Sequence, residues 1–309
     1  MNSKIKGYLL GSVAEITYGM NPLFTLPLYA DGMDPNSVLF FRYLCALPVI
    51  LLMLRWRGQS LKVSGAQILR LALLGVMFAL SSLTLFKSYN HMGAGIASTL
   101  LFVYPIVVAL IMRVVYKERL SVTTALCMVM ALTGIGLLYK GEDGSTLSLT
   151  GTVLVMVSAL SYAFYIIFTN RSNVRTLPTL TITFYVLLFG WMVFAANAFW
   201  SGTLSVPSEP VMWVNVAALA VLPTAVSLIC TTGAIQLIGS TMTAILGALE
   251  PLTAVFFGVV VFGEMLTGRD IVGIVLIIAG VSLVVGGGKI DVLLNRIVRM
   301  FPKRLRSTP

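Results

Sequence analysis

Charged residues are scarce in this chain of 309 residues. Asp, Glu, Lys and Arg together make up 10% of it, against about 25% in an ordinary soluble domain. Hydrophobic residues make up 58% and the mean hydropathy is +0.96, which excludes a soluble globular protein. The length by itself suggests two soluble domains, but the long apolar runs overrule that interpretation.

Residues that bind metals or attack substrates are also few. The chain has one histidine and three cysteines, Cys45, Cys127 and Cys230, all inside apolar runs. Their spacing fits neither a metal site nor a disulfide framework, so they are interpreted as packing residues. The glycine run before Lys289 is not a phosphate-binding loop, because Leu283 stands where the first glycine should be. We therefore predict no cofactor, no ATP-driven motor and no enzyme.

Long apolar segments are what the chain has instead. A helix needs about 20 mostly apolar residues to cross about 30 Å of hydrocarbon, and ten such segments leave no stretch for a soluble domain. The first has no small-residue cleavage site, so it is predicted to be a transmembrane helix rather than a signal peptide. The ten segments are Gly7–Leu28, Ser37–Trp56, Ile68–Phe86, Ala94–Val115, Val122–Tyr139, Leu149–Phe168, Leu180–Trp200, Val211–Thr232, Ser240–Phe262 and Ile271–Val285.

Lys and Arg are unevenly distributed over the predicted loops, which indicates an orientation. With the N-terminus in the cytoplasm, 17 of them lie on the inner side and three, Lys87, Lys140 and Arg269, on the outer side. Both termini are therefore predicted to be cytoplasmic, in a multi-pass protein of the inner (plasma) membrane. The formal net charge of +10 reflects this topology. The basic tail at residues 291–309 is predicted to lie on anionic lipid, and nucleic-acid binding is the disfavoured alternative.

The chain matches itself at a shift of about 145 residues. Gly7 falls on Gly151 at a shift of 144, and Pro105 falls on Pro251 at a shift of 146. Each copy holds five segments, and because five is odd, the second copy enters the membrane from the opposite side. We therefore predict an all-α membrane protein of ten transmembrane helices in two inverted five-helix repeats, a design in which substrate sites lie near mid-membrane. The predicted units are residues 1–144, residues 145–290 and the tail.

Glu15 is one of three charged residues predicted to lie inside the membrane, where each charge costs roughly 2.5 to 3.5 kcal/mol. It lies about 12 Å along the first segment. Its helical neighbours Gly11, Tyr18 and Pro22 belong to a small, polar face that should point into the protein. Glu15 is a candidate for binding substrate or a proton. The alternative is a buried carboxyl that pairs with a hydroxyl and holds helices together.

Glu250 precedes Pro251 in the middle of the ninth segment. Because proline removes a backbone donor, this carboxyl would lie beside a broken hydrogen-bond ladder and could bind a cation, an amine or a proton. The alternative is a neutral glutamic acid at a packing kink. Tyr104, which precedes Pro105, holds the matching place in the first repeat and is a second candidate. The predicted hinges are Pro22, Pro105, Pro251 and Gly247.

Five further candidates complete the predicted site: Arg42, two tyrosines and two serines. Arg42 could recognise an anionic group; the alternatives are a snorkelling anchor and a tie to helix ends. Tyr18 and Tyr162 match at the shift of 144 and could each turn a hydroxyl to the cavity, although packing explains them almost as well. Ser81 and Ser227 match at the shift of 146, on the third and eighth segments, whose polar residues are expected to line the cavity.

Taken together, these features resemble the EamA-type carriers of the drug/metabolite transporter superfamily over nearly the whole chain. The similarity rests on the doubled ten-segment layout, an Arg-aromatic-x-x-Ala pattern at residues 42–46, and glycine late in the fifth and tenth segments. It also rests on a repeated Pro–(apolar run)–Glu-x-Leu-(Ser/Thr) pattern, whose Glu118 and Glu264 are interpreted as structural residues near the start of the next helix. The second repeat departs from the pattern at Val186, which replaces the arginine, and Glu15 departs from the commoner apolar first helix.

The resemblance implies export or exchange of small metabolites, such as amino acids, nucleosides, sugars or drugs, without ATP. We therefore predict a secondary transporter of a small molecule that works by alternating access. Desolvation favours the protonated form of a carboxyl at mid-membrane, which suits proton coupling at Glu15 and Glu250. The alternatives are a channel or uniporter and, disfavoured because no catalytic constellation near an interface is visible, a lipid-modifying enzyme.

Overall fold

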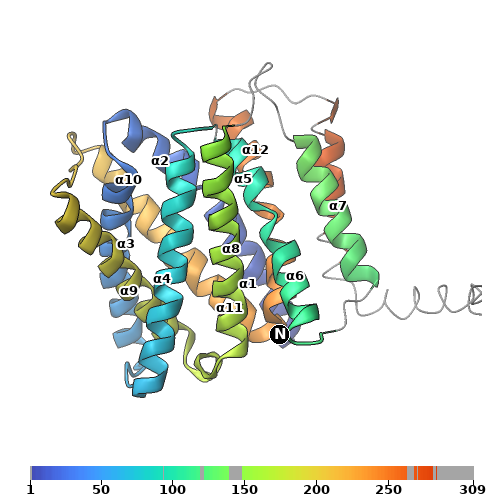
Figure 1. Ribbon diagram of the computed structural model, residues 1–309, viewed down its shortest axis with the longest axis horizontal. Coiled ribbons are helices and arrows are strands. Elements are labelled where there is room, and N and C mark those ends of the chain that lie inside the picture. The colour runs from blue at the N-terminus through green and yellow to red at the C-terminus, as the bar shows by residue number, and fades with distance from the viewer. Residues whose placement is uncertain are drawn as a thin grey trace, which may run out of the picture.

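The computed structural model describes residues 2–92, 94–118, 122–138, 148–262, 268–269, 271–280 and 283. Every regular element in that part is a helix (Figure 1), as predicted for an all-α protein. Glu264 and the basic tail lie outside the described residues. The elements are α1 (Ser3–Tyr18), α2 (Asn21–Ala30), α3 (Pro35–Trp56), α4 (Gly65–Ser88), α5 (Ala94–Leu101), α6 (Tyr104–Val114), α7 (Val122–Leu138), α8 (Leu149–Arg171), the short 3₁₀-helix η1 (Asn173–Thr176), α9 (Thr179–Ser201), α10 (Met212–Ala220), the π-helical turn η2 (Val221–Val226), α11 (Ser227–Leu246) and α12 (Leu249–Phe262). A further helical run covers Ile271–Gly280.

Capping residues explain where several of these helices begin and end. The Asp34 carboxylate accepts hydrogen bonds from the first backbone N–H groups of α3. Ser64 forms a capping box with Gln67 at the start of α4, and Ser148 caps α8. α9 ends at Gly202, whose φ of 65° lies in the left-handed region that favours glycine. Short polar side chains thus satisfy the backbone groups that helix ends leave without partners.

Five helical runs in the described part are long and apolar enough to cross a membrane. They coincide with the second, third, sixth, seventh and eighth predicted segments, and the remaining apolar helices are shorter. Large apolar side chains such as Leu52, Leu69 and Phe199 are exposed on the outside, as expected for a surface in contact with lipid. The chain is therefore a multi-pass membrane protein, and the count of ten spans stays a prediction. The five runs are Pro35–Trp56, Gly65–Ser88, Leu149–Arg171, Thr179–Ser201 and Met212–Leu246.

Three of the predicted segments are interrupted rather than continuous helices. The first is broken between α1 and α2, the fourth between α5 and α6, and the ninth between α11 and α12. The expectation that Pro251 lies in the middle of a helix was therefore wrong. Each break is followed by a proline within the first three residues of the new helix, where its missing N–H costs no hydrogen bond. These residues are the three predicted hinge prolines, Pro22, Pro105 and Pro251.

The eighth and ninth predicted segments meet inside α11 without a loop. The chain turns at Gly239, whose φ of 82° and ψ of 172° are not helical. Because the left-handed half of φ space is open to glycine at little cost, this residue can end one segment and start the next. Before it, the turn η2 widens the helix, and the Thr224 hydroxyl donates a hydrogen bond to the carbonyl of Leu219 at 2.6 Å.

Contacts between the two halves repeat with the spacing seen in the sequence. A Cβ placed on Gly7 would lie 2.6 Å from the side chain of Ile238, and one placed on Gly151 would lie 2.5 Å from the side chain of Met92. Gly7 and Gly151 are 144 residues apart, and Met92 and Ile238 are 146 apart. The same helix contact is therefore made once from each half, which fits a two-repeat architecture.

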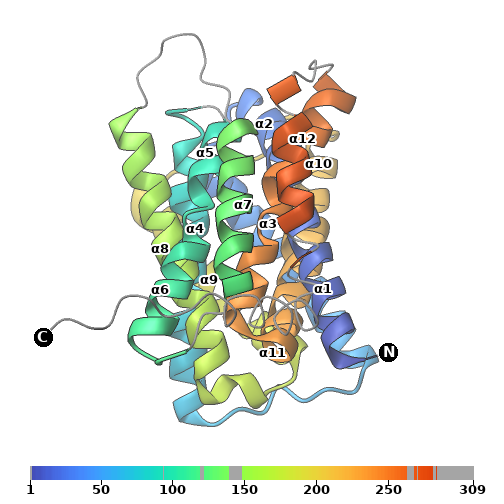
Figure 2. The same ribbon diagram turned by 90° about the vertical axis from the view of Figure 1, so that its right-hand side faces the viewer.

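A second pair of contacts shows the relative direction of two equivalent helices. A Cβ on Gly134 in α7 would lie 2.7 Å from the carbonyl oxygen of Gly273, and one on Gly280 would lie 3.2 Å from the carbonyl oxygen of Cys127. The later residue of each helix meets the earlier residue of the other, so α7 and Ile271–Gly280 run antiparallel. Figure 1 shows α7 at one edge of the bundle, and Figure 2 shows it at the front.

Candidate functional site

Glu15 lies on the face of α1 that packs against α11. The buried residues of α1 are Gly7, Gly11, Ala14, Glu15 and Tyr18, so the prediction that this face points into the protein is confirmed. The Glu15 side chain is 1% exposed, and neither carboxyl oxygen has a hydrogen-bond partner among the described residues. In the described part of the chain, Glu15 is therefore not the hydroxyl-paired tie between helices that the alternative interpretation requires.

The three helix breaks meet around Glu250 and Tyr104. Gly19, at the first break, lies so close to α12 that a Cβ on it would be 2.6 Å from the Glu250 carbonyl oxygen. Gly247, at the third break, lies directly against the Tyr104 hydroxyl, which follows the second break. Glu250 is 4% exposed and lies within electrostatic range of Glu15. Tyr104 lies within electrostatic range of both carboxyls. The breaks thus bring two carboxyls and a phenol together.

Three of the predicted tyrosines form one buried cluster beside these carboxyls. The rings of Tyr18 and Tyr162 stack with 6.3 Å between centroids and 5° between planes. Tyr104 meets Tyr162 edge to face at 4.9 Å and 73°. Glu15 lies within electrostatic range of Tyr104 and Tyr162, and Glu250 within range of Tyr18. We call this group of five residues, Glu15, Glu250, Tyr18, Tyr104 and Tyr162, the acid–tyrosine site.

Arg42 is fully buried on α3 and does not reach the membrane surface as a snorkelling anchor would. Its Nε donates a hydrogen bond to the Thr224 hydroxyl, and its Nη2 donates one to the Pro223 carbonyl at 3.0 Å. Its guanidinium carbon lies 5.9 Å from the centroid of the Tyr18 ring and 5.3 Å from that of Phe86. Arg42 therefore ties α3 to the turn η2 and borders the acid–tyrosine site through Tyr18.

The two predicted serines lie inside the protein, but only one has a described partner. Ser81 in α4 faces Ser158 in α8, with 3.1 Å between their hydroxyl oxygens, and the Ser158 hydroxyl donates to the Ser81 carbonyl at 2.8 Å. Ser81 thus joins two helices. Ser227 is buried at the start of α11, directly after η2. Lining of a cavity by these serines stays a prediction.

Two residues near the site were not among the predicted site residues, although Thr224 is one of the polar residues of the eighth segment that were expected to line the cavity. Tyr165 stacks with Tyr162 at 5.9 Å and 13°, and its position three residues further along α8 could have indicated it, since such residues share a helix face. Thr224, the partner of Arg42, is 182 residues away in the chain. No spacing rule connects two residues that are so far apart, so only the structure identifies this pair.

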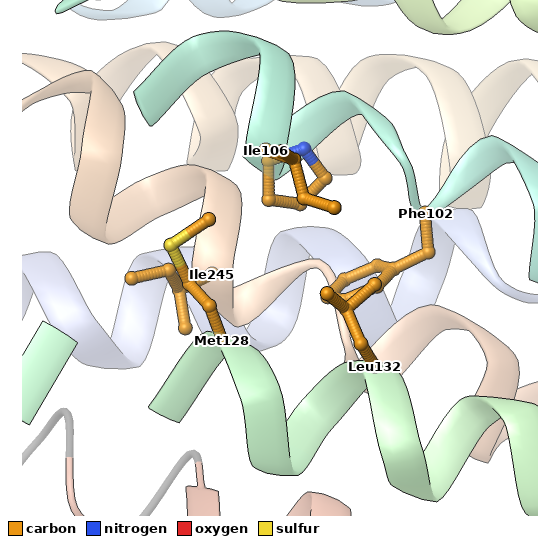
Figure 3. Close-up of a pocket in the computed structure, with 6 residues that line it drawn as sticks. Phe102, Ile106, Met128, Leu132 and Ile245 are labelled. Carbon is orange, nitrogen blue, oxygen red and sulfur yellow. The ribbon is translucent and has the colours of Figure 1, made fainter. Parts of the chain in front are cut away.

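An apolar pocket borders the break between α5 and α6 (Figure 3). Apart from the proline nitrogen and the Met128 sulfur, its drawn side chains are carbon only. Phe102 also meets Tyr104 edge to face at 6.0 Å, so the pocket and the acid–tyrosine site share a wall. The pocket supplies no polar group, and the chemistry of the region lies with the carboxyls and phenols next to it. The pocket is lined by Phe102, Pro105, Ile106, Met128, Leu132 and Ile245.

Comparisons with known proteins identify relatives over both halves of the chain. The model of the EamA-like transporter family matches residues 5–140 and again residues 149–286. An uncharacterized transporter of Bacillus subtilis, YdfC, is 25% identical over 81% of this chain and 82% of its own length. An uncharacterized transporter of Archaeoglobus fulgidus is 27% identical over 82% of this chain and 87% of its own. A known crystal structure shares the fold with a TM-score of 0.75 and 17% identity, over 90% of this chain and 95% of its own.

Proposed function

Because this chain belongs to the EamA-like transporter family, we propose that it is a secondary transporter that moves a small molecule across the cell membrane by alternating access, coupled to protons. In this proposal its halves are inverted five-helix repeats with both termini in the cytoplasm. The antiparallel contact between α7 and Ile271–Gly280 supports the inversion.

The observation that carries the proposal is a buried carboxyl, without a hydrogen-bond partner among the described residues, near the meeting point of three helix breaks. Glu15 offers two carboxyl oxygens that no described residue satisfies. Glu250 and the tyrosines of the site lie beside it. Discontinuous helices near mid-membrane are where secondary transporters bind substrate and coupling ions. Glu15 and Glu250 are therefore the proposed substrate- or proton-binding groups, and the breaks are the proposed hinges.

Contacts at the two ends of the bundle are the gates in this proposal. At one end, the Asp31 carboxylate accepts hydrogen bonds from the backbone N–H of Ser208 at 2.9 Å and from its hydroxyl. At the other end, Arg171 forms an ion pair with Glu118 at 2.8 Å. Each contact joins the first half of the chain to the second. Opening toward either side of the membrane therefore breaks one of them and leaves the other in place.

The transport test uses purified protein in proteoliposomes. A thermal-shift screen against a metabolite panel first selects compounds that stabilise the fold, and counterflow of the selected compounds is then measured with and without a pH gradient. We expect saturable counterflow that falls about thirtyfold or more in Glu15→Gln and in Glu250→Gln, as when one partner of a buried charged pair is removed. Glu209→Gln, at an exposed position outside the site and outside both gate contacts, is the matched control and should retain transport.

Two outcomes would contradict this function. Flux that never saturates and needs no counter-substrate would indicate a channel. Unchanged uptake and pH dependence in both Glu15→Gln and Glu250→Gln would remove the two carboxyls from the cycle.

The proposed orientation is tested separately by labelling. Ser60, after α3, is expected in the cytoplasm, and Thr203, after α9, is expected outside; both are exposed. In a background without the three native cysteines, an impermeant maleimide should label Thr203→Cys in intact cells and label Ser60→Cys only after lysis. The reverse result would place the termini outside.

A further inference from the structure

Among the described residues, the acid–tyrosine site holds two carboxyls that form no ion pair with a cation. Glu15 and Glu250 are 1% and 4% exposed. In the described part of the chain, the ion pair is that of Arg171 with Glu118, and neither buried carboxyl takes part in one. A carboxylate that is buried without counter-charge is costly, and such groups take up a proton or a partner instead. A ligand that satisfies this site therefore has to supply positive charge.

Arg42 does not supply that charge, because the protein already uses it. Two of its nitrogens donate to Thr224 and Pro223, and only Nη1 has no partner among the described residues. Tyr18 is within electrostatic range of both Arg42 and Glu250, so a phenol ring rather than an ion pair connects the guanidinium to the acids. An anionic ligand would have one unpartnered guanidinium nitrogen, Nη1, to bind and two carboxyls nearby to repel it.

The tyrosine rings favour a cation for a second reason. The face of an aromatic ring attracts positive charge, and clustered aromatic rings recognise ammonium groups in proteins. The ring of Tyr18 already has the Arg42 guanidinium at 5.9 Å. The rings of Tyr104 and Tyr162 are in contact with each other, and both lie within electrostatic range of Glu15. The Tyr104 hydroxyl has no hydrogen-bond partner in the described part of the chain, so it can accept a hydrogen bond from an N–H donor.

We infer that the acid–tyrosine site binds a small organic cation of the ammonium or guanidinium class, held by Glu15 and Glu250 against the tyrosine rings. This inference rests on the proposed transport function and names its substrate class. The rings are packed closely, with centroids 4.9 and 6.3 Å apart, so we expect the ligand to be a small cation rather than a fused aromatic one.

Binding of the cation and release of a proton are one exchange. When the carboxyl is protonated, its proton passes to water as the cation takes its place, so one positive charge replaces another. The residues of α11 that contact Gly11 of α1 are Ala234 and Leu246. Both are apolar, so they supply no titratable group to the exchange. Free phenols have pKa values of about 10 and stay protonated near neutral pH, which leaves the two carboxyls as the groups that exchange. The charged and titratable groups near Glu15 and Glu250 are Tyr18 of α1, Arg42 of α3, Tyr89 after α4, Tyr104 of α6 and Tyr162 of α8, and the two carboxyls also lie within electrostatic range of each other.

The test measures proton release by the purified full-length protein in detergent. Tetramethylammonium, choline and guanidinium are each added to weakly buffered protein with a pH-sensitive dye, and their affinity is measured calorimetrically from pH 5 to pH 8. We expect at least one of the three to bind with release of about one proton, and its affinity to fall about tenfold per pH unit on the acid side, because proton and cation compete for one carboxylate. 3,3-Dimethylbutan-1-ol, the uncharged analogue of choline, should not bind.

Three variants show whether the carboxyls are responsible. Glu15→Gln and Glu250→Gln should each lose proton release, and Glu209→Gln, at an exposed position, should keep it. If one of the first two does not fold, the other carries the test.

Each contrary outcome separates this inference from the function on which it rests. Failure of all three cations to bind a folded protein that does transport a neutral or anionic metabolite would overturn the cation class and leave the transport function standing. Binding of the alcohol as tightly as choline would do the same. A folded protein that transports no compound from the metabolite panel or among the three cations would overturn the proposed function itself.

Discussion

Tyr18 and Tyr162 hold equivalent places in the two halves of the chain, 144 residues apart, and their rings stack 6.3 Å apart with 5° between the planes. Equivalent residues of two copies touch one another only close to the axis that relates the copies. Tyr104 and Glu250, which are equivalent at the shift of 146, also lie within electrostatic range of each other. The site therefore lies at this axis. It is asymmetric there, because one copy supplies a phenol where the other supplies a carboxyl.

Removing the Tyr162 ring should destabilise the protein far more than removing its hydroxyl. Tyr162 packs against Tyr18, Tyr104 and Tyr165, and truncation of a buried aromatic side chain costs about 3 to 5 kcal/mol of unfolding free energy. Tyr162→Ala should therefore unfold at clearly lower temperature than the wild type, and Tyr162→Phe should stay within a few degrees of it. Thermal unfolding in detergent measures both. Phe199→Ala, which removes a ring that is 88% exposed, is the control and should have little effect.

Two glycines two residues apart in α7 should respond oppositely to the same substitution. A Cβ on Gly134 would lie 2.7 Å from the Gly273 carbonyl oxygen, which is backbone and cannot move aside without shifting its helix. A Cβ on Gly136 would have open space around it. Gly134→Ala should lower the melting temperature, whereas Gly136→Ala should leave it unchanged or raise it, since alanine is favoured over glycine within a helix by about 1 kcal/mol. Equal melting temperatures for the two variants would mean that α7 does not pack closely on Ile271–Gly280.

Composition and spacing were sufficient to predict the helical class, the repeat and the inward face of α1. Helical period and the scarcity of charge both act locally, so Glu15, Tyr18 and Tyr162 could each be singled out from their own segments. The exact form of the helix breaks could not be predicted in the same way. Pro251 signals that a regular helix is interrupted, but whether the helix kinks or ends depends on what packs against the break, here Tyr104 against Gly247.

Contacts between side chains of different helices could not be predicted from the sequence. A period of 3.6 residues shows which side of a helix is buried, and it does not show which residue of another helix lies opposite. Arg42 was therefore a candidate for an anion site, a snorkelling anchor or a structural tie, and only the Thr224 and Pro223 contacts identify the tie. Ser81 was assigned to a cavity by its polarity, and its contact with Ser158 comes from packing between α4 and α8.

Replacement of Arg42 by lysine should not preserve its role. The guanidinium donates from two different nitrogens at once, to the Thr224 hydroxyl and the Pro223 carbonyl, whereas the lysine ammonium is a compact point charge on a flexible stem. We expect Arg42→Lys to lose about 1.5 to 3 kcal/mol of unfolding free energy, the range for a hydrogen bond to a charged group. Arg57→Lys, at an exposed position after α3, is the control. Denaturant unfolding in detergent compares the two, and equal stabilities would indicate that the link between α3 and η2 contributes little.

The contact between Asp31 and Ser208 should make part of the stability depend on acid pH. Hydrogen bonds from the Ser208 hydroxyl and backbone N–H hold the pKa of the Asp31 carboxyl below its ordinary value of 3.8. A carboxyl with a lowered pKa in the folded state stabilises the protein above the unfolded value and loses that effect as pH falls through the folded value. We therefore expect the stabilisation to be complete above about pH 4 and to disappear below it. In Ser208→Ala, which removes the first of the two donors, the Asp31 pKa should rise toward 3.8. Carbon NMR titration of the Asp31 carboxyl measures this directly, with Glu209→Gln as a control that changes a neighbouring charge but not the contact. An Asp31 pKa that is the same in wild type and Ser208→Ala would show that the Asp31–Ser208 contact is broken in solution.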